Sequence, residues 1–244
     1  MSDKTLLFYE RIVALRPDEH RSLRMKLGAA GMHFAAKTHS VLLSATELPM
    51  AALDYPCVFV NDGSGSALIA LMGLREGENL MVDAEGKWAE HRYVPAFVRR
   101  YPFILAEQAG NPDMTVCFDE TFAGFSQTEG EALFNDEGKP SAYLEGVQNL
   151  LLGFHRDLQL TQQWIADIEK LGLLTDRSIG HEFDGNRTVL QGFKVVDEAK
   201  LKALSAEQKH ALFESGAMGW IYIHLVSMNN VAKLGWRLDA RMRA

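Results

Sequence analysis

The sequence predicts an α+β fold, in which an antiparallel β-rich N-terminal part at about residues 40–120 packs with a helical C-terminal part at about 140–240. Three observations predict this class. Short apolar runs of β-forming residues alternate with turn residues in the first part. Their connections are too short for the crossover that parallel strands need, which favours antiparallel pairing. In the second part the apolar period changes from two residues to about 3.6.

The β-rich part contains six runs that predict strands: VLLSATEL, YPCVFV, ALIALMGL, NLMVD, PFILAE and MTVCFDE. Residues 61–66, 75–78 and 83–86 contain glycines that suit hairpin connections. The run YVPAFVRRYP interrupts the strands and predicts a helix of about two turns. Pro95 suits the first turn of this helix, and Pro102 disfavours helical geometry in the residue before it.

The helical part begins with one long amphipathic helix. Its apolar residues recur at helical spacing from Tyr143 to Ile168, and we expect it to end near Gly172. The run RTVLQGFKVV at 187–196 predicts a strand, and residues 197–198 open a turn or a helix.

A further helix is predicted near the C-terminus. Ser205 and Gln208 have the spacing of a capping box, which marks where a helix begins. The apolar pattern continues this helix towards Leu234, with Gly216 and Gly219 as candidate break points.

The composition is that of an ordinary folded protein, at 47% hydrophobic and 23% charged residues. The chain has 25 Lys and Arg against 32 Asp and Glu, a net charge of −7. This balance argues against a nucleic-acid binder, because a phosphate backbone requires a clustered cationic face. No internal repeat or long linker is present, so we expect one domain over residues 1–244.

The apolar runs and the cysteines predict a cytoplasmic protein. The run Leu6–Tyr9 is shorter than the apolar core of about 7–15 residues in a secretory signal. The stretch Ala217–Val226 is far shorter than the roughly 20 residues that span a bilayer. Cys57 and Cys117 lie in apolar runs, where a reduced thiol packs as a small hydrophobe. We therefore expect no membrane span and no disulfide.

Two motifs that resemble nucleotide-binding or hydrolase sites are incomplete. The run GEALFNDEGKP ends in Gly-Lys like a phosphate loop, but Leu133 stands where glycine is required and Pro140 replaces the metal-binding hydroxyl. Ser126 lacks the second glycine of a nucleophile elbow, because Thr128 occupies that position. We expect neither nucleotide binding nor a serine nucleophile, and no cofactor is indicated.

A metal-assisted enzyme, an oxygenase or a hydrolase, is the alternative function. His181, Glu182 and Asp184 lie together, and His224 or His210 would supply the remote histidine of a metal triad. An exposed polar loop explains the first three residues without a metal, and we favour that interpretation. The sequence does not decide between an enzyme and a binding protein.

Seven residues are the candidates for ligand binding: Tyr93, Arg99, Arg100, Tyr101, Asp119, Glu120 and His224. Consecutive residues on a helix point about 100° apart, so one of the two arginines is expected to face outward, near the ring of Tyr93 or Tyr101. A guanidinium beside an aromatic ring can hold a carboxylate or a phosphate through two hydrogen bonds. This geometry predicts an anion-binding segment.

The acidic and histidine candidates each have a structural interpretation as well. Asp119 and Glu120 end a predicted strand, where two carboxylates can do acid–base chemistry. Alternatively the two arginines pair with Asp119, Glu120 or Glu107 and only hold the helix in place. His224 lies in the apolar run WIYIHL and must be hydrogen-bonded if buried. We favour a core histidine over a site group.

Several segments resemble the SapC-like family of bacterial proteins. The most specific is YVPAFVRRYPF at residues 93–103. The other matching segments are DYP and VFV at 54–60, ALMGLREGENL at 70–80, CFDE at 117–120, ALF at 132–134, GF at 192–193 and YIHLVS at 222–227. The resemblance covers about residues 8–235, with Met81 where an aromatic residue is usual and Phe97 where tyrosine is common.

The resemblance implies no established activity and no catalytic residues. Family members are often encoded beside TonB-dependent receptors, halogenase-like proteins and cupin-like proteins, which implies a role in uptake or processing of a peptide or another organic ligand. We therefore expect an accessory protein that binds an anionic small molecule, a peptide or a protein partner through residues 93–103. A scaffold for surface-layer assembly, implied by the family name alone, ranks last.

Overall fold

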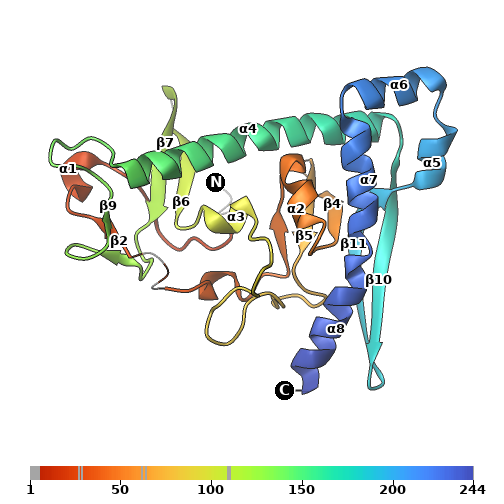
Figure 1. Ribbon diagram of the computed structural model, residues 1–244, viewed down its shortest axis with the longest axis horizontal. Coiled ribbons are helices and arrows are strands. Elements are labelled where there is room, and N and C mark those ends of the chain that lie inside the picture. Colours follow the sequence, from red (N-terminus) through yellow and green to blue (C-terminus); the bar gives the residue numbers. More distant parts are fainter. Residues whose placement is uncertain are drawn as a thin grey trace. The chain divides into compact units, whose positions relative to one another are not determined.

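The computed structural model describes residues 6–243 except 27, 29, 62, 64, 109 and 110 (Figure 1). It confirms an α+β fold with antiparallel sheets and a helical C-terminal part. The chain forms two compact units. Unit 1 comprises Met1–Ala35, Ala84–Lys87 and Ala96–His155, and unit 2 comprises Ala36–Asp83, Trp88–Pro95 and Arg156–Ala244. In the described part of the chain, no helix is both long and apolar enough to cross a membrane.

Unit 1 is built on two small antiparallel sheets. In one sheet the strands are, in spatial order, β1 (Ile12–Ala14), β7 (Asn111–Asp119) and β6 (Phe103–Gln108). In the other they are β8 (Phe125–Ser126), β2 (Arg24–Met25) and β9 (Glu131–Ala132). Its short helices are α1 (Pro17–His20), the 3-10 helix η1 (His33–Ala35) and α3 (Ala96–Arg99).

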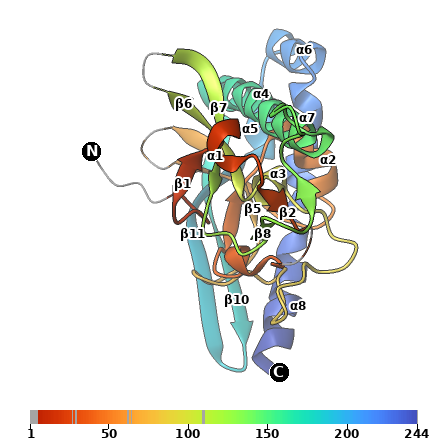
Figure 2. The same ribbon diagram turned by 90° about the vertical axis from the view of Figure 1, so that its left-hand side faces the viewer.

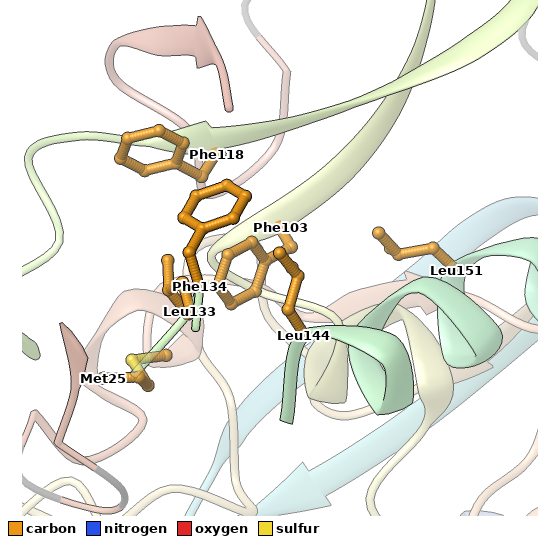
Figure 3. Packing of buried hydrophobic residues seen from close by; sticks show 7 residues of the cluster. All are labelled: Met25, Phe103, Phe118, Leu133, Phe134, Leu144 and Leu151. Carbon is orange, nitrogen blue, oxygen red and sulfur yellow. The ribbon is translucent and has the colours of Figure 1, made fainter. Parts of the chain in front are cut away.

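A buried cluster joins the two sheets of unit 1 to helix α4 (Ala142–Lys170). Figure 3 shows its members: Met25, Phe103, Phe118, Leu133, Phe134, Leu144 and Leu151. The first part of α4, up to His155, belongs to this unit. Burial of these apolar side chains is what allows such short strands to be stable.

Unit 2 contains a five-stranded antiparallel sheet. Its strands are, in spatial order, β10 (Leu174–Phe183), β11 (Asn186–Val196), β4 (Cys57–Asn61), β5 (Ser66–Leu71) and β3 (Ser40–Leu42). Its helices are η2 (Ala45–Glu47), α2 (Leu48–Ala51), the end of α4, α5 (Glu198–Ala203), α6 (Ala206–Glu214), α7 (Ala217–Ser227) and α8 (Asn230–Arg243). Helix α7 contacts strands β11 and β4. Strands β10 and β11 form one long hairpin (Figure 2).

Most helical predictions for the C-terminal part are confirmed, but the last helix is also interrupted between Ser227 and Asn230, and it extends beyond Leu234 to Arg243. Helix α4 ends two residues before Gly172, which has a φ of +68°. Ser205 and Gln208 form the predicted capping box at the start of α6. Gly216, whose φ of 76° is left-handed, separates α6 from α7. Gly219 lies inside α7.

Three predictions for the β-rich part are wrong in detail. The strand VLLSATEL ends at Leu42, because Ser44 and Glu47 form a capping box that opens η2. The run NLMVD forms turns, with only one bridge between Val82 and Trp88. Helix α3 has four residues, about one turn, in place of two.

Strand β10 replaces the polar loop that we expected around residues 181–186. His181 and Glu182 pair with β11 residues, and only residues 184–185 form the turn. Most side chains of β10 are exposed or partly exposed. A strand without a buried face does not require alternating apolar and polar residues. The sequence of β10 therefore lacks the pattern from which strands are predicted.

Candidate functional site

The seven predicted ligand-binding residues are divided between the two units. Unit 1 holds Arg99, Arg100, Tyr101, Asp119 and Glu120, and unit 2 holds Tyr93 and His224.

Arg99 is exposed and Arg100 is half-buried, as the helical geometry predicts. The guanidinium carbon of Arg100 lies 4.2 Å from the ring centre of Phe97 and 5.5 Å from that of Phe154. Burial lowers the pKa of Arg100, and the neighbouring Tyr9 hydroxyl opposes this shift. The Nε atom has no hydrogen-bond partner among the described residues. Arg100 thus packs into an aromatic layer through cation–π contacts.

Asp119 is fully buried and binds the N-terminal segment. Its carboxylate accepts hydrogen bonds from the main-chain N–H groups of Glu10 (2.8 Å) and Arg11 (3.2 Å). It also accepts from the Thr121 hydroxyl (2.7 Å) and the Tyr101 hydroxyl (3.3 Å). Burial by itself raises the pKa of Asp119, but the hydrogen bonds from Glu10, Thr121 and Arg11 together lower it. The contacts support a structural role for this carboxylate.

Glu120 forms an ion pair with Arg11, in the same N-terminal segment. Tyr9, also in this segment, donates a hydrogen bond from its hydroxyl to the Phe103 carbonyl at 2.7 Å. The side chain of Glu107, a third candidate partner for the arginines, lies outside the described residues. The two acids at the end of β7 therefore hold the N-terminal segment in place.

Tyr93 is hydrogen-bonded within unit 2 through its side-chain hydroxyl and through its main chain. Its hydroxyl donates to Glu47 Oε1 at 2.9 Å, and its main-chain N–H donates to Asp54 Oδ2 at 2.8 Å. Its carbonyl accepts a hydrogen bond from the Tyr55 hydroxyl. Tyr93 thereby fixes the course of the loop that carries Arg92.

His224 is a fully buried core histidine. Its Nδ1 lies 2.7 Å from the Cys57 carbonyl, and its Nε2 accepts a hydrogen bond from the Val196 N–H at 3.0 Å. Burial lowers the pKa of His224 to about 4, although the bond to Cys57 opposes the shift. The imidazole therefore joins α7 to β4 and β11 in its neutral form.

The residues that the alternative metal site would use do not form a cluster in the described part of the chain. His181 Nε2 lies 2.6 Å from Asp239 Oδ1 on α8. Glu182 follows it in strand β10, where successive side chains point to opposite faces. Among the residues that the structure describes, no three His, Cys, Asp or Glu side chains come close enough to hold a metal ion.

A pocket in unit 2 brings together residues that the sequence analysis did not select. The cationic pocket, as we call it, has a volume of about 420 Å³ and is lined by Asp54, Met81, Arg92, Lys233, Trp236, Arg237 and Ala240. Four of these residues lie on α8, at positions that share one face of the helix. The others come from the turn after α2 and from the loops after β5.

Most of the cations around this pocket already have partners. Arg92 Nη1 donates to Asp54 Oδ1 at 2.9 Å, and Lys233 Nζ donates to the Leu53 carbonyl at 3.0 Å. One turn further along α8, Arg241 donates to two main-chain carbonyls, both at 2.8 Å. Arg237 forms neither a hydrogen bond nor an ion pair with any described residue. Of these four cations, Arg237 is therefore the one whose guanidinium is available to bind a ligand.

The electrostatics of the cationic pocket favour an anion. Burial lowers the pKa of Arg237, and the positive charges of Arg92 and Arg241 lower it further, while Tyr55 and the carboxylate of Asp54 oppose the shift. Asp54 is the single carboxylate among the lining residues, and its side chain is only 7% exposed. An anion beside Arg237 would relieve the repulsion between these cations. Trp236 adds an indole that is 68% exposed.

A sequence signal for this site existed but was incomplete. Lys233, Arg237 and Arg241 recur every four residues, which is one helical face if the helix continues. The apolar pattern predicts a helix only as far as about Leu234, so it does not place these three cations on one helical face. Arg92 is distant in sequence, and only the fold brings it to them.

The comparison with known proteins decides the family. The model of the SapC family matches residues 15–234. The chain belongs to the SapC family. No curated protein and no solved structure matches the chain. The segment that matches SapC includes Asp54, Arg92 and Lys233, whereas Trp236 and Arg237 lie just beyond it.

Proposed function

We propose that this SapC-family protein is an accessory binding protein that takes an anionic organic ligand into the cationic pocket. The observation that carries the proposal is Arg237, a half-buried guanidinium without a partner among the described residues. Partial burial of a charge is unfavourable, and an opposite charge offsets this cost. An anionic ligand supplies that charge, and the guanidinium offers it two parallel hydrogen bonds.

The lining residues support binding more than catalysis. Asp54, the carboxylate of the pocket, is engaged by Arg92 and by the Tyr93 N–H. Lys233 and Arg237 present N–H donors, which orient an anion and suit binding better than proton abstraction. The role in uptake or processing of a peptide or another organic ligand, implied by the family resemblance, fits a protein that holds such a ligand.

The proposed setting is a reducing compartment such as the cytoplasm. Cys57 and Cys117 are free and buried, as expected for thiols that serve as packing groups. A small-molecule or peptide ligand is proposed in preference to a nucleic acid, since the net charge of −7 opposes phosphate-backbone binding.

Isothermal titration calorimetry with phenyl phosphate, phthalate and benzoate tests this function. At least one of these probes is expected to bind the wild-type chain, and Arg237→Gln to weaken it by about tenfold or more. Arg187→Gln is the matched control, because Arg187 is an exposed arginine of the same unit that lies outside the pocket. Binding that is equal in the Arg237→Gln and Arg187→Gln variants, or no binding by any probe, contradicts the proposal.

A further inference from the structure

We infer that the cationic pocket selects a phosphate monoester in its dianionic form, whose organic body lies against Trp236. The inference rests on the proposed anion-binding function and specifies its ligand class. Three features of the pocket carry it: the number of charges that lack compensation, the directions from which the donors come, and the apolar part of the lining.

The lining contains three cations and one carboxylate. Asp54 compensates Arg92 through their ion pair at 2.9 Å. Lys233 donates to a neutral carbonyl, and Arg237 forms no hydrogen bond or ion pair with a described residue, so the lining keeps an excess of two positive charges. A monoanion would leave one of them in place, whereas a dianion matches both.

The donors come from separate parts of the fold. Arg92 lies in the loop before α3, while Lys233 and Arg237 lie on successive turns of α8. A phosphate monoester presents three terminal oxygens in different directions, so it can accept from a guanidinium fork and from further donors at once. A carboxylate presents two oxygens in one plane and suits a single fork. The spread of donors therefore favours phosphate.

The remaining residues that line the pocket are apolar. They are Met81, Trp236 and Ala240, and the volume of about 420 Å³ leaves room for more than a bare phosphate ion. The indole of Trp236 is 68% exposed and so is open to stacking with a planar group. These residues suit the organic part of the ester.

The pH dependence of binding is expected to come from the ligand. The charged and titratable groups that face the ligand or Arg237 are Asp54, Tyr55, Arg92, Lys233, Arg237 and Arg241. Carboxylates, lysines, tyrosines and arginines ordinarily titrate outside the range from about pH 5.5 to about 7.5. The second proton of a phosphate monoester leaves near pH 6, inside this range.

Calorimetry with three phenyl probes tests the inference. Phenyl phosphate is a dianion near pH 7.5, phenyl sulfate is a tetrahedral monoanion, and phthalate is a dianion with planar carboxylates. We expect phenyl phosphate to bind about tenfold more tightly than either of the others. Its affinity is expected to fall about fourfold from about pH 7.5 to about pH 5.5, while that of phenyl sulfate stays constant.

Two variants isolate the contributions of the lining. Lys233→Gln removes one positive charge and is expected to reduce the preference for phenyl phosphate over phenyl sulfate. Trp236→Ala is expected to weaken phenyl phosphate without changing the affinity for inorganic phosphate. Circular dichroism and the affinity for inorganic phosphate show that the Trp236→Ala variant is folded.

The outcomes separate this inference from the proposed function. If phenyl sulfate or phthalate binds as tightly as phenyl phosphate, and Arg237→Gln weakens all three, the pocket binds anions but the phosphate inference is overturned. If no probe binds, both are overturned. If the protein sediments with phosphatidic acid vesicles and phenyl phosphate releases it from them, the phosphate belongs to a lipid headgroup. Binding of the soluble probe alone would assign it to a soluble ester.

Discussion

At the scale of single residues, His224 shows how burial controls protonation. Its two ring nitrogens bond to the main chain at Cys57 and Val196, so only the neutral imidazole fits. The pKa of His224 is lowered from 6.5 to about 4 by burial. The unfolded chain therefore binds a proton that the folded chain excludes between these two values.

The stability contributed by a neutral His224 is complete above about pH 6.5 and falls as the pH drops towards 4. We expect the wild type to lose about 2 kcal/mol from this group between about pH 7.5 and about pH 5.0. Urea unfolding of wild type and of His224→Gln at both pH values checks this. The variant is expected to be about 1–3 kcal/mol less stable at the higher pH and to lack this component of the pH dependence. An identical pH dependence in both proteins would contradict the assignment.

Asp119 makes a second prediction at this scale. Asp119→Asn converts an acceptor of several hydrogen bonds into a group that also carries donors, opposite main-chain N–H groups of Glu10 and Arg11. We expect a loss of about 1.5–3 kcal/mol in urea unfolding. Glu120→Gln is the control, since it removes only the partly exposed pair with Arg11 and is expected to cost less than about 1 kcal/mol. Equal effects would remove the structural distinction between the two acids.

At the scale of elements, α8 depends on one glycine for its contact with β10. A Cβ atom at Gly235 would lie 2.7 Å from His181 Nδ1, so the imidazole that bonds to Asp239 would have to move. Gly219 in α7 has no atom within 4 Å of such a Cβ. Both glycines are in helices without a positive φ.

The two glycines therefore make a matched pair of substitutions. Gly235→Ala is expected to destabilise the protein by about 1–3 kcal/mol through overpacking. Gly219→Ala is expected to stabilise it by about 0.4–1 kcal/mol, because alanine loses less conformational entropy on folding than glycine. Thermal unfolding of both variants measures the difference. A stabilising Gly235→Ala would mean that the His181 contact to Asp239 is dispensable.

At the scale of the whole molecule, each unit contains one buried thiol. Cys117 belongs to unit 1 and Cys57 to unit 2. Burial raises the pKa of Cys57 to about 12, and burial also raises that of Cys117. Since the thiolate is the reactive form, both cysteines are protected while their own unit is folded.

Thiol labelling during urea unfolding follows the two units separately. Helix α4 is continuous and supplies residues to both units, so we expect them to unfold in one cooperative transition. Both cysteines are then labelled with the same midpoint, read by mass spectrometry of the labelled peptides. Two separate midpoints would contradict the prediction of a single domain.

Periodicity and local turn chemistry were sufficient for part of the fold. The apolar stripe from Tyr143 to Ile168 predicts α4, and the capping box at Ser205 marks where α6 begins. These features depend on residues close together in the chain. Such local features do not predict the exposed strand β10. Its stability comes from pairing with β11, and its residues show no apolar alternation.

The sequence by itself determined the fold class, the main helices and the family, because period, caps and family segments are local properties of the chain. Tertiary structure decided the site. It placed Arg92 beside α8, paired it with Asp54, and left Arg237 without a partner among the described residues. It also buried Asp119 and His224 in structural hydrogen bonds. The function of a charged side chain depends on which partners the fold provides, and those partners lie far away in the sequence.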